Sequence, residues 1–183
     1  MKLKEYFKEL SIVVLGIVIA LWVNNLGMNS NNRKTQKQVL QTVLNETQSN
    51  SVNVDSLLIN IDWLSSQFSK LKEKEGFAVI DIDYFYFGLI LKNSSYEAAK
   101  YTGILSGLDY NQLSILVSVY ESHNLLGSMD KSLIDIFLSL PKVKVNNNQI
   151  NYMLFYLNAY KGFLLDLRAQ QAELIKSLEK SLN

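Results

Sequence analysis

The chain lacks cysteine altogether and holds one histidine and one proline among its 183 residues. Without cysteine it has no disulfide, no thiolate nucleophile and no cysteine-based metal site. A lone histidine, His123, cannot supply a zinc site that needs several imidazoles. The single proline, Pro141, leaves long stretches free to form uninterrupted helices, because proline breaks a helix interior.

An excess of charge of either sign is also missing. The 18 basic and 17 acidic side chains give a net charge of +1, and only two of the basic residues, Arg33 and Arg168, are arginines. The sequence contains no block of basic residues that would follow the phosphates of a nucleic acid. We therefore expect no nucleic-acid partner.

The residue patterns of common catalytic sites are absent too. No G-x-S-x-G turn, no glycine-rich phosphate loop and no Glu-x-x-His pair occurs. Asp81 and Asp83 precede a helical pattern, where aspartate is ordinarily an N-cap. Glu121 and His123 are two apart and do not share a helix face, so we expect His123 at the surface or hydrogen-bonded between helices. The sequence predicts no enzyme, no cofactor and no metal site.

One long hydrophobic run stands near the start of the chain. Leu10–Val23 contains a single polar residue and no charge. A bilayer core about 30 Å thick requires roughly 20 apolar helical residues, a length reached here only when Phe7 and Asn24–Met28 are counted. Three interpretations remain: an uncleaved transmembrane anchor, a cleaved signal peptide, or a buried helix of a soluble protein. We favour the anchor, residues 10–28, because no small-residue cleavage pattern follows the run.

The orientation of this anchor is weakly encoded. Basic residues are nearly balanced on its two sides, and a long domain crosses a membrane with little regard to its charge. We expect residues 1–9 to form a cytoplasmic tail and residues 29–183 to lie in the periplasm. The predicted location is the inner (cytoplasmic) membrane, with a single pass and the lipid bilayer as a partner.

The rest of the chain is rich in helical periodicity. Apolar residues recur every three or four positions, which is the pattern of amphipathic helices. The sequence predicts an all-α fold, an up-and-down bundle of about four main helices. We expect the last helix to lie antiparallel to the first. The four predicted helices span Arg33–Lys74, Asp83–Leu91, Tyr110–Leu140 and Gln149–Leu182.

Local signals place the ends of several elements. Ser94 and Glu97 have the spacing of a capping box, which predicts a short helix over Ser95–Thr102 that Gly103 ends. Asp109 is expected to cap the third main helix, and Asn147 or Asn148 the last.

Three stretches stay open. Gly27–Asn32 is either a hinge or part of a continuous helix, and Phe77–Ile82 is either a strand or a loop. The polar stretch Thr47–Asn53 can hold a kink, a water molecule or a polar contact.

Two local patterns, ELSIVVLGIVIALWVNN at Glu9–Asn25 and SSYEAAKYTG at Ser94–Gly103, are similar to motifs of a known family. They resemble the anchor and the S-x-Y/F-x-x-L-x-x-S/T-G motif of a large uncharacterised family of small membrane proteins from Bacteroidota. Leu113 and Tyr120 also follow the motif as in that family. Leu26 departs from it, because the family often has tryptophan or an acidic residue there. The resemblance implies a membrane location and a helical domain, and it implies no activity.

The chain contains 10 tyrosines, whose side chains are both aromatic and polar. Residues 84–87 are consecutive aromatics, so they cannot all face one core. Core packing with the hydroxyl at the rim explains most of the others. The candidate interaction surface consists of Tyr84, Tyr86, Tyr96, Tyr101 and Tyr120.

These observations favour a membrane-anchored, non-catalytic interaction or scaffold protein of the cell envelope. Its expected partner is another envelope protein or a second copy of the chain. The alternative is a ligand-sensing helical bundle that signals through a partner protein.

Overall fold

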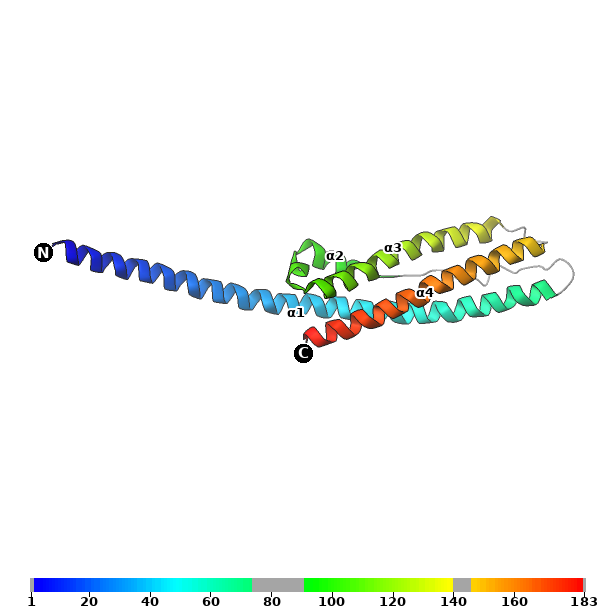
Figure 1. Ribbon diagram of the computed structural model, residues 1–183, viewed down its shortest axis with the longest axis horizontal. Helices are drawn as coiled ribbons and strands as arrows, with labels where there is room; N and C mark the ends of the chain where they lie inside the picture. The colour runs from blue at the N-terminus through cyan, green and yellow to red at the C-terminus, as the bar shows by residue number, and fades with distance from the viewer. Residues whose placement is uncertain (1, 74–90, 140–145, 183) are drawn as a thin grey trace. The chain divides into compact units, whose positions relative to one another are not determined.

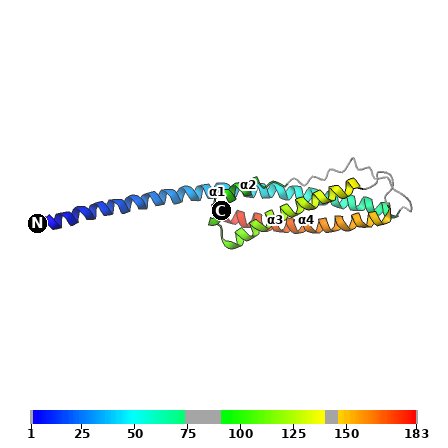
Figure 2. The ribbon, with the colours of Figure 1, turned by 90° about the horizontal axis from the view of Figure 1, so that it is seen from above.

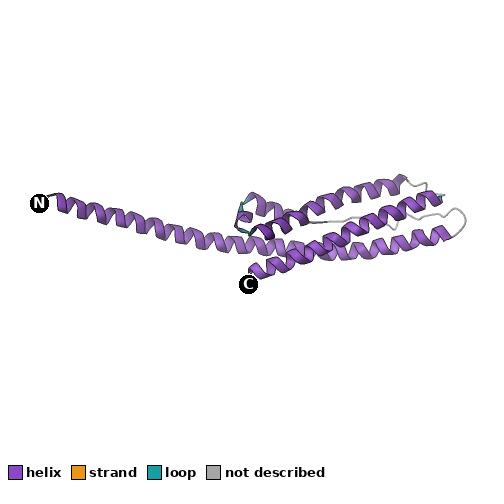
Figure 3. Cartoon of the chain, in the orientation of Figure 1, coloured by secondary structure: helices purple, strands orange, loops and turns teal. Residues whose placement is uncertain are grey.

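The protein is all-helical in a computed structural model that describes residues 2–73, 91–139 and 146–182, with side chains described for 33–72, 91–136 and 146–182. Four α-helices pack as a bundle, with one 3-10 turn between the second and third (Figures 1 and 3). Within these ranges no residue is in a strand. The elements are α1 (Lys2–Glu73), α2 (Ser94–Tyr101), η2 (Ile104–Gly107), α3 (Tyr110–Ser139) and α4 (Asn147–Leu182). The predicted all-α bundle is confirmed.

The chain divides into two compact units, Met1–Val39 and Leu40–Asn183. In the first unit, α1 continues through Gly27–Asn32, so the continuous helix is the correct alternative there. Among the residues whose side chains are described, no helix is long and apolar enough to cross a membrane. The expected anchor, residues 10–28, lies outside those residues and stays a prediction.

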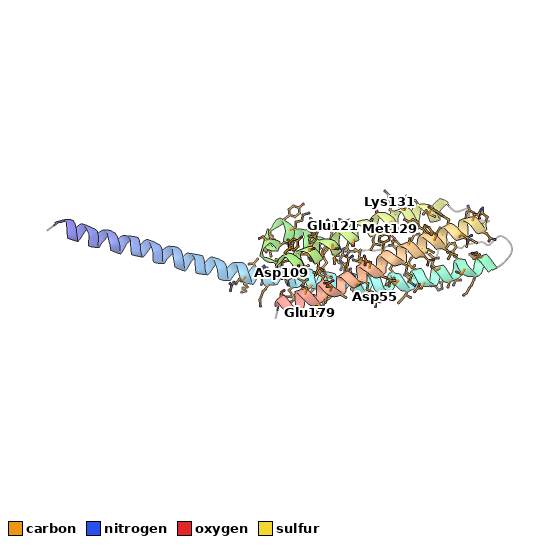
Figure 4. All side chains as sticks on the ribbon, viewed as in Figure 1. Asp55, Asp109, Glu121, Met129, Lys131 and Glu179 are labelled. Atoms are coloured by element: carbon orange, nitrogen blue, oxygen red, sulfur yellow. The ribbon has the colours of Figure 1, made fainter. Side chains whose placement is uncertain are left out.

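In the second unit, α4 runs antiparallel to α1, as the sequence predicts. As the residue numbers rise along α1, the residue numbers of the partners on α4 fall. Gln48 donates to Glu179 at 3.5 Å, and Asp55 pairs with Arg168 at 2.7 Å. One heptad further along α1, Asp62 pairs with Lys161. Asp55 and Glu179 are labelled in Figure 4, and Figure 2 shows α1 and α4 side by side from another direction.

Helix α3 also packs antiparallel to α4. Gln170 Oε1 on α4 accepts hydrogen bonds from the Ser118 and Ser122 hydroxyls on α3, at 3.2 Å and 3.1 Å. Farther along, the Tyr156 hydroxyl donates to the Met129 carbonyl at 3.1 Å. Helices α1 and α3 are therefore parallel to each other, and both run against α4.

The core lies between these three long helices and is covered at one end by α2 and η2. Most of the apolar residues that recur at helical spacing are buried, but Leu125 and Phe163, which also follow this spacing, are exposed. The buried apolar side chains that define the three long stripes include Val43, Val54, Ile61, Leu64, Phe68, Leu116, Val119, Leu126, Leu133, Ile150, Met153, Leu157, Leu164, Leu167, Leu174 and Leu178.

The predicted helix ends agree with the structure in part. Asp109 caps α3, because its Oδ1 accepts a hydrogen bond from the Gln112 N–H at 2.9 Å. Gly103 ends α2 with a left-handed φ of 70°, a conformation that costs glycine little. Residues 83–90 of the predicted helix Asp83–Leu91, its caps Asp81 and Asp83, and the run Phe77–Ile82 lie outside the described residues, and Leu91 itself is not helical.

Two predicted caps are wrong. Helix α4 is capped by Asn146, not Asn147 or Asn148: Asn146 and Gln149 exchange side chain-to-backbone hydrogen bonds at 2.9 Å in both directions. At α2 the N-cap residue is Asn93, which makes no side-chain cap bond, and Ser94 lies inside the helix. The physical reason is that a carboxylate from another helix occupies the place of a local cap.

Candidate functional site

The Glu46 carboxylate on α1 accepts four hydrogen bonds within the bundle. Its side chain is buried, with 6% of the residue exposed. Oε2 accepts hydrogen bonds from the Ser95 N–H at 2.8 Å and from the Ser94 hydroxyl at 3.0 Å. Oε1 accepts one from the Tyr120 hydroxyl at 2.8 Å and a longer one from the Tyr96 N–H at 3.4 Å. One carboxylate thus joins α1, α2 and α3.

This carboxylate caps α2 from outside the helix. The first N–H groups of any α-helix have no partner within it, and their partial positive charge attracts an anion. Burial raises the pKa of the Glu46 carboxyl, but the hydrogen bonds from Ser95, Tyr120 and Ser94 outweigh burial and hold it below its usual range. Glu46 is therefore ionised at neutral pH despite being buried.

Asn50, one turn further along α1, holds the chain that leads into α2. Its Nδ2 donates to the Lys92 carbonyl at 2.7 Å, and its Oδ1 accepts from the Lys92 N–H at 2.8 Å. A fully buried amide thereby satisfies both backbone groups of one residue. Asn50 and Glu46 are four apart and lie on the same helix face, so α1 fixes residues 92–96 at two successive points. The polar stretch of α1 therefore serves as a polar contact.

Two aromatic rings stack beside Glu46. The rings of Tyr96 and Tyr120 lie 4.1 Å apart between centroids and are tilted by only 9°. Burial and the hydrogen bond to Glu46 raise the pKa of the Tyr120 phenol, which keeps it protonated as a donor. The Tyr120 ring also meets the His123 ring edge-on, with centroids 4.9 Å apart. The stack thus continues from α2 into the middle of α3.

His123 joins α3 to α4 in the interior. Its Nε2 lies 3.2 Å from Nε2 of Gln171, and the histidine is 6% exposed. Of the two placements expected for His123, the interhelical one is correct. Burial lowers its pKa to about 4, against an opposing effect of the Glu46 charge. The neutral imidazole then accepts the Gln171 amide hydrogen at Nε2.

Two buried polar atoms at this pair have no hydrogen-bond partner among the described residues. They are His123 Nδ1 and Gln171 Oε1. Buried polar atoms are nearly always paired, and leaving one unpaired costs about 1–3 kcal/mol. The pair is therefore the least satisfied part of the polar interior.

The structure separates the five candidate tyrosines. Tyr96 and Tyr120 are brought together in the stack, where Tyr120 is buried and Tyr96 is half-buried. Tyr101 is exposed at the end of α2, away from this stack. Tyr84 and Tyr86 lie outside the described residues.

Sequence reasoning missed Glu46, Asn50 and Gln171 as interior polar groups. The available signal was positional, since Glu46 and Asn50 lie three and seven residues after Val43 on the apolar face of α1. Gln171 likewise continues the stripe of Leu164 and Leu167 on α4. A polar residue within an apolar stripe indicates a buried polar contact.

The hydrogen bonds of Glu46 attach α2 and α3 to α1. The oxygens of Glu46 are engaged by donors from two other helices, so the carboxylate holds them in place. Within the described part of the chain, no group of three or more acidic or histidine side chains is placed to hold a metal ion.

Comparison of the chain with protein-family models, curated proteins and solved structures gives no match.

Proposed function

We propose that the protein is a membrane-anchored, non-catalytic interaction or scaffold protein of the cell envelope. Residues 10–28 anchor it in the inner membrane, with residues 1–9 in the cytoplasm and residues 29–183 in the periplasm. The apolar run of residues 10–23 supports this location. The resemblance to the uncharacterised family of small membrane proteins supports it as well.

The observation that carries the interaction role is an exposed apolar face along α1 and α4. Ile59 is 70% exposed and Trp63 is 50% exposed, and Val52 on α1 and Leu165 on α4 are exposed beside them. We call these four residues the α1–α4 face. Exposed aliphatic and tryptophan side chains that cluster on a helical domain indicate a protein contact.

The ion pairs of the bundle place these residues together. Ile59 lies between Asp55 and Asp62 on α1, and Leu165 lies between their partners on α4. Ile59 and Leu165 therefore stand at the same level of the two antiparallel helices. Val52 and Trp63 are seven before and four after Ile59, spacings that keep all three on one side of α1. The four residues thus lie along one side of the α1–α4 contact, with the two ion pairs between them.

Crosslinking followed by purification of the full chain from native membranes tests this role. The wild-type chain should recover a stable protein neighbour or a crosslinked second copy. The double variant Ile59→Ser/Trp63→Ser should lose it, because serine removes the apolar contact area. Leu125→Ser removes an exposed leucine from α3 and should leave recovery unchanged. Recovery of no neighbour by the wild-type chain, or equal recovery by all three chains, would refute the role.

A second candidate function is a sensory module that binds a small molecule and signals through a partner. It is favoured by His123 Nδ1 and Gln171 Oε1, two buried polar atoms without a partner among the described residues. A ligand that both donates and accepts hydrogen bonds would satisfy them. Uptake of such a metabolite by the wild-type chain, lost in Gln171→Leu, together with no protein neighbour, would favour the sensor.

A further inference from the structure

The side of α4 that turns away from the bundle core carries three exposed aromatic side chains. Phe155 is 72% exposed, Tyr152 is 55% exposed and Phe163 is 44% exposed. They lie on both sides of Ala159, a small exposed residue in the orange stretch of α4 in Figure 1. Phe155, Ala159 and Phe163 are four apart, so they form one ridge along the helix surface. We use the name outer α4 row for Tyr152, Phe155, Ala159, Phe163 and Asp166.

The outer α4 row is separate from the α1–α4 face. Leu165 of that face is two residues from Phe163, so it points to nearly the opposite side of the helix. Lys161, also two residues from Phe163, pairs with Asp62 and marks the side of α4 that faces α1. All residues of the row belong to the unit Leu40–Asn183, so the row is defined without reference to the unit Met1–Val39.

The outer α4 row is nearly symmetric about Ala159. A phenylalanine lies four residues before it and another four residues after it, while Tyr152 and Asp166 lie seven residues before and seven after. When two copies of such a helix pack antiparallel about a two-fold axis at Ala159, each residue before the axis meets the residue equally far after it in the other copy. A two-fold contact uses the same surface twice and therefore requires this self-complementarity.

We propose that the outer α4 row pairs with the same row of a second copy of the chain, with the two α4 helices antiparallel. This pairing sets Phe155 level with Phe163 of the other copy, twice. It also sets the Tyr152 hydroxyl, a donor, level with the Asp166 carboxylate of the other copy, an acceptor. Asp166 accepts one described hydrogen bond, from Gln170 at 3.1 Å, and a carboxylate accepts several. Parallel pairing would instead bring two Asp166 carboxylates together, and like charges repel.

The exposed aromatic area suits a contact that uses the row twice. An aromatic side chain offers about 150–250 Å², so the three partly exposed rings provide about 350 Å² per copy and about 700 Å² in a pair. A specific interface buries about 1,200–2,000 Å² in total. The rings of two copies thus supply more than half of the lower figure, and the exposed Asn151 and Asn158 beside the row supply a polar rim. The inference goes beyond the proposed function and rests on neither the anchor nor the α1–α4 face.

Because the chain contains no cysteine, a single introduced cysteine reports the contact. Ala159→Cys stands on the proposed axis, where helices about 8–10 Å apart bring the two copies of position 159 within the Cα separation of about 4.4–6.8 Å that a disulfide needs. The full chain is oxidised mildly in detergent micelles, where each bundle is free to take either direction, and analysed on a non-reducing gel. Tyr110→Cys, exposed at the start of α3, is the control for random collision. We expect at least about five times more disulfide dimer from Ala159→Cys, because only that position is held within this separation.

A mixture of Tyr152→Cys and Asp166→Cys chains, carrying tags of different size, tests the direction of the pairing. Antiparallel pairing joins the two variants to each other. It leaves each variant uncrosslinked when alone, because the two copies of one position then stand about 21 Å apart along the helix axis at about 1.5 Å per residue. Dimer formation by either variant alone would show parallel pairing and overturn the proposal.

Paired serine variants test whether the aromatic side chains hold the contact. Phe155→Ser with Phe163→Ser, added to Ala159→Cys, should reduce the disulfide dimer to the yield of the collision control. Ile59→Ser with Trp63→Ser, added instead, should leave the yield unchanged, because those residues belong to the α1–α4 face. The two faces are thereby tested apart. Far-ultraviolet circular dichroism of each variant checks that its helices are intact, which the exposure of the changed residues favours.

Two further outcomes overturn the pairing. Equal dimer yields from the cysteines at positions 159 and 110 would mean that the outer α4 row does not meet a second copy. Protection of the cysteine at position 159 from a maleimide in native membranes, without disulfide dimer, would mean that a different protein covers the row.

Discussion

The hydroxyl of Tyr120 donates a 2.8 Å hydrogen bond to Oε1 of Glu46, a residue 74 positions earlier in the chain. This bond closes a contact among α1, α2 and α3 in which every donor converges on one ionised carboxylate. Hydrogen bonds to a charged group are stronger than neutral ones, and their loss leaves buried donors without a partner. The stability of the bundle should therefore depend strongly on Glu46.

Replacing Glu46→Gln keeps the size of the side chain and removes its charge. One of the two acceptor atoms becomes a donor that faces other donors, so we expect a loss of about 3 kcal/mol in the free energy of unfolding. Urea titration followed by circular dichroism measures it. Glu97→Gln, a change of a half-exposed glutamate in the first turn of α2, should cost under about 0.5 kcal/mol. A similar loss in both variants would contradict the capping role of Glu46.

Removing only the hydroxyl, in Tyr120→Phe, should keep the ring stack with Tyr96 and lose the bond to Glu46. We expect a loss of about 1–2 kcal/mol in the free energy of unfolding. Tyr101→Phe removes an exposed hydroxyl and should change it by less than about 0.3 kcal/mol. A double-mutant cycle with Glu46→Gln should give a coupling energy of at least about 0.5 kcal/mol. Additive losses would show that the two side chains do not interact.

Asn50→Ala should leave both backbone groups of Lys92 without their partner. We expect a loss of about 1–3 kcal/mol in the free energy of unfolding, because the two hydrogen bonds between Asn50 and the Lys92 backbone are lost. The control is Asn45→Ala, because the exposed Asn45 side chain accepts one hydrogen bond at 3.0 Å from Gln41 among the described residues. Hydrogen exchange of the Lys92 amide gives a local measurement. If its protection is unchanged in Asn50→Ala, the side-chain pairing is not formed in solution.

The lone histidine predicts a pH dependence with a defined sign. Burial lowers the pKa of His123 from 6.5 to about 4, so the unfolded chain binds a proton that the folded chain excludes. The contribution of the neutral histidine to the free energy of unfolding is fully present above pH 6.5. The free energy of unfolding falls as the pH drops toward 4, by about 2 kcal/mol between pH 7.5 and pH 5. Lowering of the Glu46 pKa acts in the same direction, but only from below about pH 4.5.

Thermal unfolding of an untagged chain at pH 7.5, 6 and 5 checks this dependence. His123 is the only histidine of the chain, so His123→Gln should remove the slope between pH 7 and pH 5. A slope that persists in His123→Gln would assign the titration to another group.

The anchor is tested by placing charge in the apolar run. Each arginine at the centre of a spanning helix costs about 2.5–3.5 kcal/mol, so Leu15→Arg with Ile19→Arg should release or degrade the protein. Membrane fractionation with an alkaline wash measures retention. A matched variant, Leu125→Arg, changes an exposed residue of α3 and should stay with the membrane. Unchanged retention of the double variant would exclude a spanning segment.

The helices were predictable because their signals are local. Apolar spacing set the stripes of α3 and α4, and Asp109 and Gly103 marked ends that the structure confirms. The cap of α2 was not predictable in this way. Ser94 and Glu97 match the local capping pattern, but Glu46 lies 48 positions before Ser94, and only the packing of α2 against α1 brings them together.

The partners of the buried polar side chains escaped prediction for the same reason. His123 has no partner near it in sequence, and its contact with Gln171 requires the register between α3 and α4. Leu125 and Phe163 extend the apolar stripes in sequence but are exposed at their outer edges, where none of the described helices covers them. Apolar spacing predicts which side of a helix is buried, whereas the width of the buried side depends on the neighbouring helices.

The side chain of Asn50 bonds to main-chain atoms of residue 92, and the Glu46 carboxylate bonds to the main-chain N–H groups of residues 95 and 96. Such bonds are indifferent to which side chains stand at those three positions, proline excepted, because it has no N–H to give. They do require a fixed number of residues between 92 and 95. Positions 92 and 95 should therefore accept wide amino-acid variation through evolution, whereas the insertion or deletion of a single residue between them should be rejected.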